Sequence, residues 1–78
     1  MTYTVYSRSG CPYCEKVVKV LELSKQKFVE YKLNVDFTRD QFYEEFGKGS
    51  TFPQVVVDEK HIGGCTDTIA FLKESNII

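Results

Sequence analysis

Two cysteines three positions apart are the residues best suited to chemistry in this chain. Cys11 and Cys14 enclose a proline and a tyrosine in a C-x-x-C motif, and Cys65 is the third cysteine. So few cysteines, in an odd number, do not make the disulfide framework of a secreted domain. The motif instead predicts either a redox-active dithiol or half of a metal site.

A zinc site would need further ligands beyond the motif. The remaining candidates are Cys65 and His61, which form neither a second C-x-x-C motif nor a paired-histidine spacing. Pro12 also favours a helical turn within the motif. We therefore expect no metal ligands in this protein, and thiol–disulfide exchange is the chemistry that the cysteines predict.

The residues around the motif place Cys11 at the start of a helix. Residues 3–7 are rich in β-branched and aromatic side chains, and Arg8, Ser9 and Gly10 follow, which predicts a short strand entering a loop. Pro12 then suits the first turn of a helix. The unpaired N–H groups and partial positive charge of a helix N-terminus stabilise a thiolate and so lower its pKa.

The size of this effect requires more than the helix dipole. Lowering the pKa of Cys11 by about three units from ~8.5 requires roughly 4 kcal/mol of extra stabilisation of the anion. A helix dipole supplies ~0.3 to 1 kcal/mol, and about 2 kcal/mol when the charge is partly buried. We therefore expect the N–H groups of Tyr13 and Cys14, helped by Arg8 or Lys16, to supply the remainder.

The two cysteines are expected to play different roles. Cys14 lies one helical turn after Cys11, on the face that carries Val17 and Leu21, so we expect Cys14 to be shielded and Cys11 to be exposed. Cys11 would then attack the substrate disulfide. Cys14 would displace the product by closing a Cys11–Cys14 disulfide.

The middle of the chain predicts one strand and one short helix. Residues 28–35 alternate in polarity and form a second strand, which a right-handed crossover would place parallel to the first. Thr38 and Gln41 make a capping box for a short helix, and Gly47 ends it.

The last third of the chain completes a single α/β domain. Residues 54–57 and 60–63 predict a hairpin, and Thr66 is expected to cap a final helix that buries Leu72. The resulting order is β-α-β-α-β-β-α. We find no linker or internal repeat, and we expect one domain over residues 1–78.

Composition restricts the classes of partner. The chain has 78 residues, 42% of them hydrophobic, and ten basic against eleven acidic residues give a net charge of -1. This net charge is not that of a protein with the large basic surface needed to bind nucleic acid or an anionic membrane. The N-terminus has no signal-peptide pattern, and no apolar stretch is long enough to span a bilayer. We therefore expect a monomer that folds alone and resides in the cytoplasm.

Three fragments of the sequence resemble a known family. They are Cys11-Pro12-Tyr13-Cys14, Thr51-Phe52-Pro53 and Gly63-Gly64-Cys65-Thr66-Asp67. In this order and spacing they are similar to the dithiol C-P-Y-C type of glutaredoxin, in the thioredoxin-like superfamily. The resemblance covers nearly the whole chain and implies a thioredoxin-like fold with a four-stranded mixed sheet flanked by three helices.

The resemblance also implies an activity. Glutathione would serve as co-substrate, with no tightly bound cofactor, and the enzyme would donate electrons to protein disulfides and glutathione mixed disulfides. Ribonucleotide reductase is one protein client suggested by analogy with the family. No nucleic acid or membrane partner is expected.

A set of glutathione-binding residues follows from the same resemblance. Arg8 and Tyr13 would flank the cysteinyl-glycine part of glutathione, Phe52 would pair through its backbone, and Pro53 would be a cis-proline. Thr66 and Asp67 would hold the γ-glutamyl end at a helix N-terminus. Without the resemblance, we would interpret Arg8 as a solvated loop charge and Tyr13 as a packing residue. Pro53 would be an ordinary trans-proline, and Asp67 a routine acid in the first turn of a helix.

Some positions depart from the family pattern. Phe52 replaces a more frequent valine, Thr66 replaces a frequent aspartate, and Arg8 replaces a frequent lysine. Glu59 stands where the hairpin turn usually has glycine, which predicts a different turn type. Thr66 leaves one fewer acidic group to hold the amino group of glutathione.

Three alternatives to this activity remain. Thioredoxin reductase could replace glutathione as the reductant, two subunits could hold a [2Fe-2S] cluster through Cys11 and glutathione, or the chain could be a non-catalytic binding module. Pro12 argues against the cluster by analogy with relatives. Cys65 is expected to be a small buried residue near the site, and His61 a surface residue of the hairpin.

Overall fold

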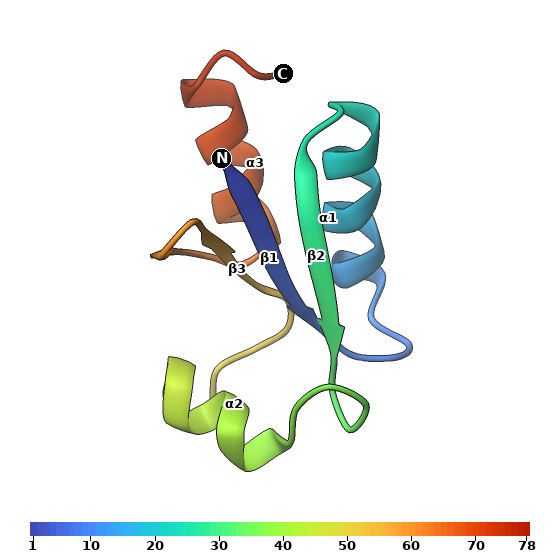
Figure 1. The fold of residues 1–78 in the computed structure, drawn as a ribbon, viewed down its shortest axis with the longest axis vertical. Coiled ribbons are helices and arrows are strands. Elements are labelled where there is room, and N and C mark those ends of the chain that lie inside the picture. The colour runs from blue at the N-terminus through green and yellow to red at the C-terminus, as the bar shows by residue number, and fades with distance from the viewer.

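The computed structural model describes every residue from Met1 to Ile78. The chain forms seven elements in the predicted order β-α-β-α-β-β-α, which are β1 (Thr2–Ser7), α1 (Pro12–Leu23), β2 (Lys27–Lys32), α2 (Arg39–Phe46), β3 (Gln54–Val57), β4 (Lys60–Gly63) and α3 (Cys65–Glu74). The strands make one sheet in the order β2-β1-β3-β4. β1 is parallel to β2 and antiparallel to β3, and β4 is antiparallel to β3. The predicted four-stranded mixed sheet with three helices is therefore confirmed, and Figure 1 shows α1 and α3 beside the strands and α2 beyond their ends.

The core lies between one face of the sheet and the helices α1 and α3. Residues of β1 alternate in burial, and Tyr3, Val5 and Ser7 are completely buried. The side chains that form this core come from the two central strands, β1 and β3, and from both helices, and they are Tyr3, Val5, Val17, Leu21, Val55, Val57, Cys65 and Leu72. This packing holds the N-termini of α1 and α3 against the sheet, and these two helix starts carry Cys11, Tyr13 and Cys14 on one side and Thr66 and Asp67 on the other.

The second strand is shorter than the sequence predicts. β2 ends at Lys32, whereas the alternating pattern continues to Val35. The chain turns here because Asn34 has a φ of 65° and the N–H groups of Val35 and Asp36 both donate to the carbonyl of Lys32. Val35 is 78% exposed as a result. Periodicity alone could not locate this turn because the alternation of polar and apolar residues runs through it.

β2 also turns its apolar positions away from the core. Val29 and Tyr31 pair in register with Thr4 and Tyr6, which are the β1 residues that face away from α1 and α3. They are 42% and 40% exposed, whereas Phe28 on the opposite face packs against the core. The sheet therefore has a second, partly apolar face, and α2 lies at one end of it (Figure 1).

The last helix begins earlier than predicted. Gly64, in an extended conformation, is the N-cap of α3, and the N–H of Gly64 donates to the Asp67 carboxylate over 3.2 Å. The prediction that Thr66 caps this helix is therefore wrong, because Thr66 already lies within the first turn. Thr68, which is buried, donates its hydroxyl hydrogen to the carbonyl of Gly64 at 2.8 Å.

The predicted bounds of the second helix and of the hairpin are confirmed, and the first two strands each begin one residue earlier than predicted. Thr38 and Gln41 form the capping box of α2, with the Gln41 N–H donating to Thr38 Oγ1 at 3.2 Å and the Thr38 N–H donating to Gln41 Oε1 at 2.9 Å. Gly47 ends α2, and the β3–β4 hairpin has the predicted bounds. None of the helices has both the length and the apolar character needed to cross a membrane.

Candidate active site

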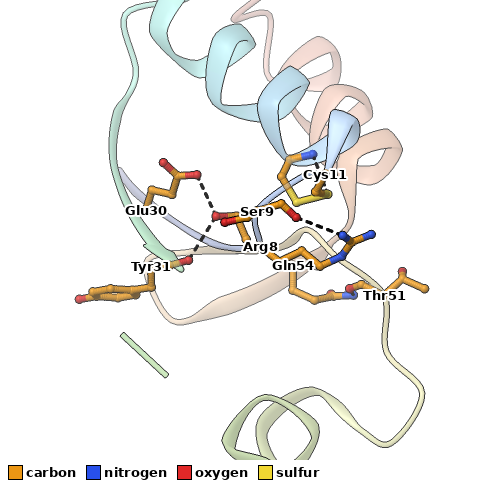
Figure 2. Close-up of a disulfide and its surroundings, with 9 residues drawn as sticks. Arg8, Ser9, Cys11, Glu30, Tyr31, Thr51 and Gln54 are labelled. Atoms are coloured by element: carbon orange, nitrogen blue, oxygen red, sulfur yellow. Dashed lines mark hydrogen bonds between the residues drawn. A yellow bond between two sulfur atoms is a disulfide. The ribbon is translucent and has the colours of Figure 1, made fainter. Parts of the chain in front are cut away.

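The two motif cysteines are joined as a disulfide at the first turn of α1 (Figure 2). Cys11 is the N-cap of α1 in an extended conformation, and Gly10 before it has a φ of 67°, which a glycine adopts without strain. The Cα atoms of Cys11 and Cys14 are 5.2 Å apart. The backbone N–H of Cys14 donates a hydrogen bond to Cys11 Sγ at 3.2 Å. The sulfur of Cys11 thus lies where the free N–H groups of a helix start can reach it.

The predicted difference in exposure between the cysteines is absent in this oxidised pair. Cys11 is 3% exposed and Cys14 is 2% exposed, so the prediction of an exposed Cys11 is wrong for the disulfide form. The cysteines differ in position instead. Cys11 precedes the helix and receives a hydrogen bond, whereas Cys14 lies within the helix on its buried face.

The basic side chains do not contribute as predicted. The guanidinium of Arg8 donates to the carbonyl of Ser9 at 3.2 Å and makes no hydrogen bond to a cysteine sulfur. Lys16 is exposed on α1. Of the two predicted backbone donors, the N–H of Cys14 makes the bond to Cys11 Sγ. In this structure a backbone N–H group donates the hydrogen bond to the Cys11 sulfur, and no charged side chain does.

A hydrogen-bonded pair that sequence reasoning missed lies among the residues around the disulfide. The Ser7 hydroxyl donates to Glu30 Oε2 at 2.8 Å and lies 3.4 Å from the carbonyl of Tyr31 (Figure 2). Ser7 is completely buried at the end of β1, and Glu30 comes from β2. The alternation of β1 would have placed Ser7 on the core side, but no local pattern identified Glu30 as its partner.

A cavity of about 350 Å³ brings most of the predicted glutathione-binding residues together. Tyr13, Phe52, Pro53, Thr66 and Asp67 all line it. The remaining lining residues are Thr51, Gln54, Gly63, Gly64 and Cys65. Arg8 is the one predicted binding residue that does not line the cavity.

The wall of the cavity is held by hydrogen bonds that the sequence did not predict. Gln54 is 8% exposed, its Nε2 donates to the carbonyl of Thr51 at 2.8 Å, and its Oε1 lies 2.6 Å from His61 Nε2. The Phe52–Pro53 peptide bond is cis, as the resemblance implied. His61 is exposed on the hairpin, as predicted, and it also fixes the Gln54 side chain.

Gly63 and Asp67 fit together at the far side of the cavity. Gly63 has a φ of 127°, and a Cβ atom at this position would collide with the carboxylate of Asp67. The carboxylate can therefore reach back to the N–H of Gly64 only because residue 63 has no side chain. The Gly63-Gly64 pair was visible in the sequence, but this reason for it was not.

Cys65 is a buried thiol at the start of α3. It is 8% exposed and lines the cavity, as expected for a small buried residue near the site. Burial raises the pKa of the Cys65 thiol, and the positive charge of Lys16 opposes this only in part. Cys65 is the free cysteine of the chain.

No three of the chain's histidine, cysteine, aspartate and glutamate side chains lie close enough together to hold a metal ion. Tyr13, which is 64% exposed, lies between Cys11 and Cys14 in the sequence and also lines the cavity, so it connects the disulfide motif with the cavity wall. The arrangement can thus place an extended peptide-like molecule beside a pair of sulfurs that exchange two electrons.

Comparisons with known proteins agree with this geometry. The glutaredoxin family model matches residues 3–62. A glutaredoxin of Vibrio cholerae is 37% identical and glutaredoxin 1 of Salmonella typhimurium is 38% identical, and each alignment covers 96% of this chain and 94% of the relative.

Solved structures extend the agreement to the fold. Reduced Escherichia coli glutaredoxin superposes with a TM-score of 0.82 at 28% identity over all of both chains. Glutaredoxin 1 of Francisella tularensis, solved with cacodylate, gives a TM-score of 0.81 at 30% identity and covers 96% of this chain and 95% of its own. The expected thioredoxin-like fold is therefore confirmed. A match of this extent in sequence and fold, on a chain whose motif cysteines are joined, makes this protein a thiol–disulfide oxidoreductase that belongs to the glutaredoxin family.

Proposed function

We propose that this protein uses glutathione to reduce protein disulfides and glutathione mixed disulfides through Cys11 and Cys14. The observation that carries the proposal is the Cys11–Cys14 disulfide at a helix start, with a cavity of peptide size adjoining the motif through Tyr13. The protein would act as a single-domain monomer. Its few cysteines, one of them a free thiol, favour the cytoplasm, and ribonucleotide reductase is one client suggested by analogy with the family.

In the first half of the cycle the reduced enzyme attacks. The Cys11 thiolate bonds to one sulfur of the substrate disulfide, the substrate S–S bond breaks, and the other sulfur leaves as a thiolate that takes a proton. The Cys14 thiolate then attacks Cys11 Sγ in this mixed disulfide. The product sulfur leaves as a thiolate. The enzyme has then given two electrons to the substrate, and its two cysteines are joined as the Cys11–Cys14 disulfide.

Glutathione completes the cycle. One glutathione thiolate opens the enzyme disulfide and forms a mixed disulfide with Cys11, which frees Cys14. A second glutathione attacks the glutathione sulfur, releasing glutathione disulfide and the Cys11 thiolate. Two glutathione molecules thus supply the two electrons that the substrate receives.

The stability of the Cys11 thiolate is the physical requirement of this cycle. A thiolate at the position of Cys11 Sγ would keep the hydrogen bond from the Cys14 N–H and lie at the positive end of α1. Both effects favour the anion and lower its pKa. The same effects make Cys11 a good leaving group in the last step, when the second glutathione attacks the glutathione sulfur of the mixed disulfide.

The cavity offers matching groups for glutathione. The γ-glutamyl part carries a carboxylate and an amino group, and the first turn of α3 has free N–H groups beside the carboxylate of Asp67. Phe52 can offer backbone groups to the extended middle of the molecule. Thr66 lacks a charge, so Asp67 is the acid in this wall that would attract the amino group.

The test compares cysteine variants in a glutathione-coupled assay on a small mixed disulfide of glutathione and on a disulfide-bonded protein. We expect Cys11→Ser to abolish both activities. Cys14→Ser should accumulate a mixed disulfide with the protein substrate, which intact-mass spectrometry detects. Cys65→Ala removes the third thiol, which has no step in the cycle, so this variant should still form and resolve the mixed disulfide. Because Cys65 lines the cavity, the KM for glutathione is not the readout of this comparison. An active Cys11→Ser variant would contradict the mechanism.

The source of electrons needs a separate measurement. Turnover with glutathione and glutathione reductase should exceed turnover with thioredoxin reductase under the same conditions. If thioredoxin reductase alone supports turnover, the cysteine roles stand but the glutathione assignment is wrong. Asp67→Asn should raise the KM for glutathione while leaving direct reduction of the enzyme by dithiothreitol unchanged, because dithiothreitol has no γ-glutamyl group.

A further inference from the structure

A second concave site lies on the face of the sheet opposite α1 and α3. Its floor consists of Tyr6 from β1, Phe37, and Phe42 and Phe46 from α2, and it encloses about 290 Å³. We name it the aromatic groove. The mechanism described above uses none of these residues.

The rings of the aromatic groove support one another. The ring centroid of Tyr6 is 5.0 Å from that of Phe46 and 5.4 Å from that of Phe37, both in edge-on geometry. Phe42 is 1% exposed and forms the bottom. Tyr31, 40% exposed, extends the aromatic surface at the β2 side with its ring centroid 5.7 Å from that of Tyr6. A buried base with half-exposed walls is suited to receiving a side chain from outside.

The rim of the groove is negatively charged. Asp36 and Glu45 line it, and no lysine or arginine does. The N–H of Lys32 donates to the Asp36 carboxylate at 2.9 Å and holds it at the rim. The pKa of Tyr6 is raised mainly by burial and then by the charge of Glu45, which is consistent with a carboxylate close to the aromatic floor. Aromatic faces and carboxylates together attract a cation that has apolar neighbours.

The aromatic groove is joined to the cavity beside the cysteines. Phe52 lines that cavity, and its ring stacks on Phe42 with centroids 4.1 Å apart and planes 12° apart. Phe37 also stacks with Phe52, at 6.3 Å and 21°. One aromatic stack therefore forms a wall of both sites, so a polypeptide with its disulfide at Cys11 can extend across Phe52 into the groove.

We propose that the aromatic groove docks a segment of the protein substrate in which a lysine or arginine lies next to an apolar side chain. The occupant is a polypeptide because the groove continues from the site where the substrate disulfide reacts. Its basic character follows from charge complementarity with Asp36 and Glu45. The inference rests on the proposed function and adds a preference among protein disulfides to it.

The test uses two synthetic peptides of equal length. Each carries one cysteine as a mixed disulfide with glutathione and, after a flexible spacer, either Phe-Arg-Phe-Lys or Phe-Glu-Phe-Asp. We expect kcat/KM to favour the basic peptide by about three- to tenfold, mainly through KM, and we expect the ratio to fall with added salt. A series of spacer lengths allows for the path across Phe52.

Charge-reversal variants locate the preference. Glu45→Lys should bring the basic-to-acidic ratio to about one or below it. Glu44→Lys makes the same change in charge on the same helix, at an exposed residue that does not line the groove, and should keep the wild-type ratio. Equal loss of preference in both variants would show a general charge effect and overturn the inference.

Two further measurements separate this inference from the proposed function. Wild-type turnover of the mixed disulfide of glutathione and cysteine tests the proposed function alone. If that turnover is present and the two peptides react equally, the docking inference is wrong and the proposed function stands. Titration with the basic peptide lacking cysteine should shift the NMR signals of the Tyr6 and Phe46 rings, and unchanged signals would also overturn the inference.

Discussion

At the scale of single residues, position in the backbone distinguishes the three cysteines more than exposure does. All three are buried, at 3%, 2% and 8% exposure for Cys11, Cys14 and Cys65. Cys11 receives an N–H bond at a helix start, whereas Cys65 has a pKa raised by burial. Cys11 is the N-cap of α1, whereas Cys65 is the first residue inside α3, where burial without a donor to the sulfur favours the neutral thiol.

The raised pKa of Cys65 predicts a pH dependence of stability. In the native state Cys65 keeps its proton to a higher pH than in the unfolded state, so between the two pKa values the unfolded chain binds fewer protons. The free energy of unfolding should be unaffected by this group at pH 7 and should fall as the pH rises above ~8.5. Urea denaturation of the oxidised protein at pH 7 and pH 9.5 measures the change.

Cys65→Ala is the comparison for this prediction. This variant should remove most of the decrease in the free energy of unfolding between pH 7 and pH 9.5. The other two groups with raised pKa values, Tyr3 and Tyr6, start from a usual pKa of about 10, so they stay largely protonated in this range and contribute little to the decrease. If the variant and the wild type lose stability equally, the decrease belongs to other groups.

At the scale of elements, the turn before α3 links backbone conformation to the binding wall. Gly63→Ala should lower stability by more than the ~1 to 3 kcal/mol of an unfavourable backbone conformation, because the new methyl group also displaces the Asp67 carboxylate. It should raise the KM for glutathione as well. Gly49→Ala is the control, since Gly49 has a φ of 86° but open space around its Cβ position. Equal effects of the two variants on both readouts would count against the role of Asp67.

The N-terminal caps of α2 and α3 give a second prediction at this scale. Thr38→Ala should cost about 1 kcal/mol of the free energy of unfolding, because it leaves the Gln41 N–H without its acceptor. Thr66→Ala should change stability by less than about 0.5 kcal/mol, because Thr66 makes no capping bond in α3. Urea denaturation of both variants compares the cap that the sequence predicted correctly with the one that it placed wrongly.

At the scale of the whole molecule, Tyr3 joins the sheet to α3. Its ring is completely buried and contacts Phe71 edge-on with centroids 6.3 Å apart, but its hydroxyl oxygen is buried without a hydrogen-bond partner. An unpaired buried hydroxyl costs roughly 1 to 3 kcal/mol of desolvation. The ring therefore stabilises the core while the hydroxyl opposes it.

Removing that hydroxyl should stabilise the protein. Tyr3→Phe keeps the ring, and we expect the free energy of unfolding to rise by about 1 kcal/mol. Tyr13→Phe is the control, because Tyr13 is 64% exposed and its change should be within about 0.5 kcal/mol. A loss of stability in Tyr3→Phe would mean that the hydroxyl has a partner in solution, such as an ordered water.

The sequence by itself determined the element order, the hairpin, the capping box at Thr38 and the place of the C-x-x-C motif at a helix start. These features depend on local physics: periodicity of apolar side chains, turn residues and the fixed φ of proline act over a few neighbouring residues. The resemblance to a family added six predicted glutathione-binding residues, five of which line one cavity.

Only the tertiary structure decided the features that join distant segments. The burial of Cys11, the bond from Ser7 to Glu30 and the stack of Phe52 on Phe42 each depend on residues brought together from different parts of the chain. Local patterns do not encode such contacts, because each partner looks like an ordinary polar or aromatic residue in its own segment. Packing of the sheet against its helices gives these residues their shared positions, and therefore their roles.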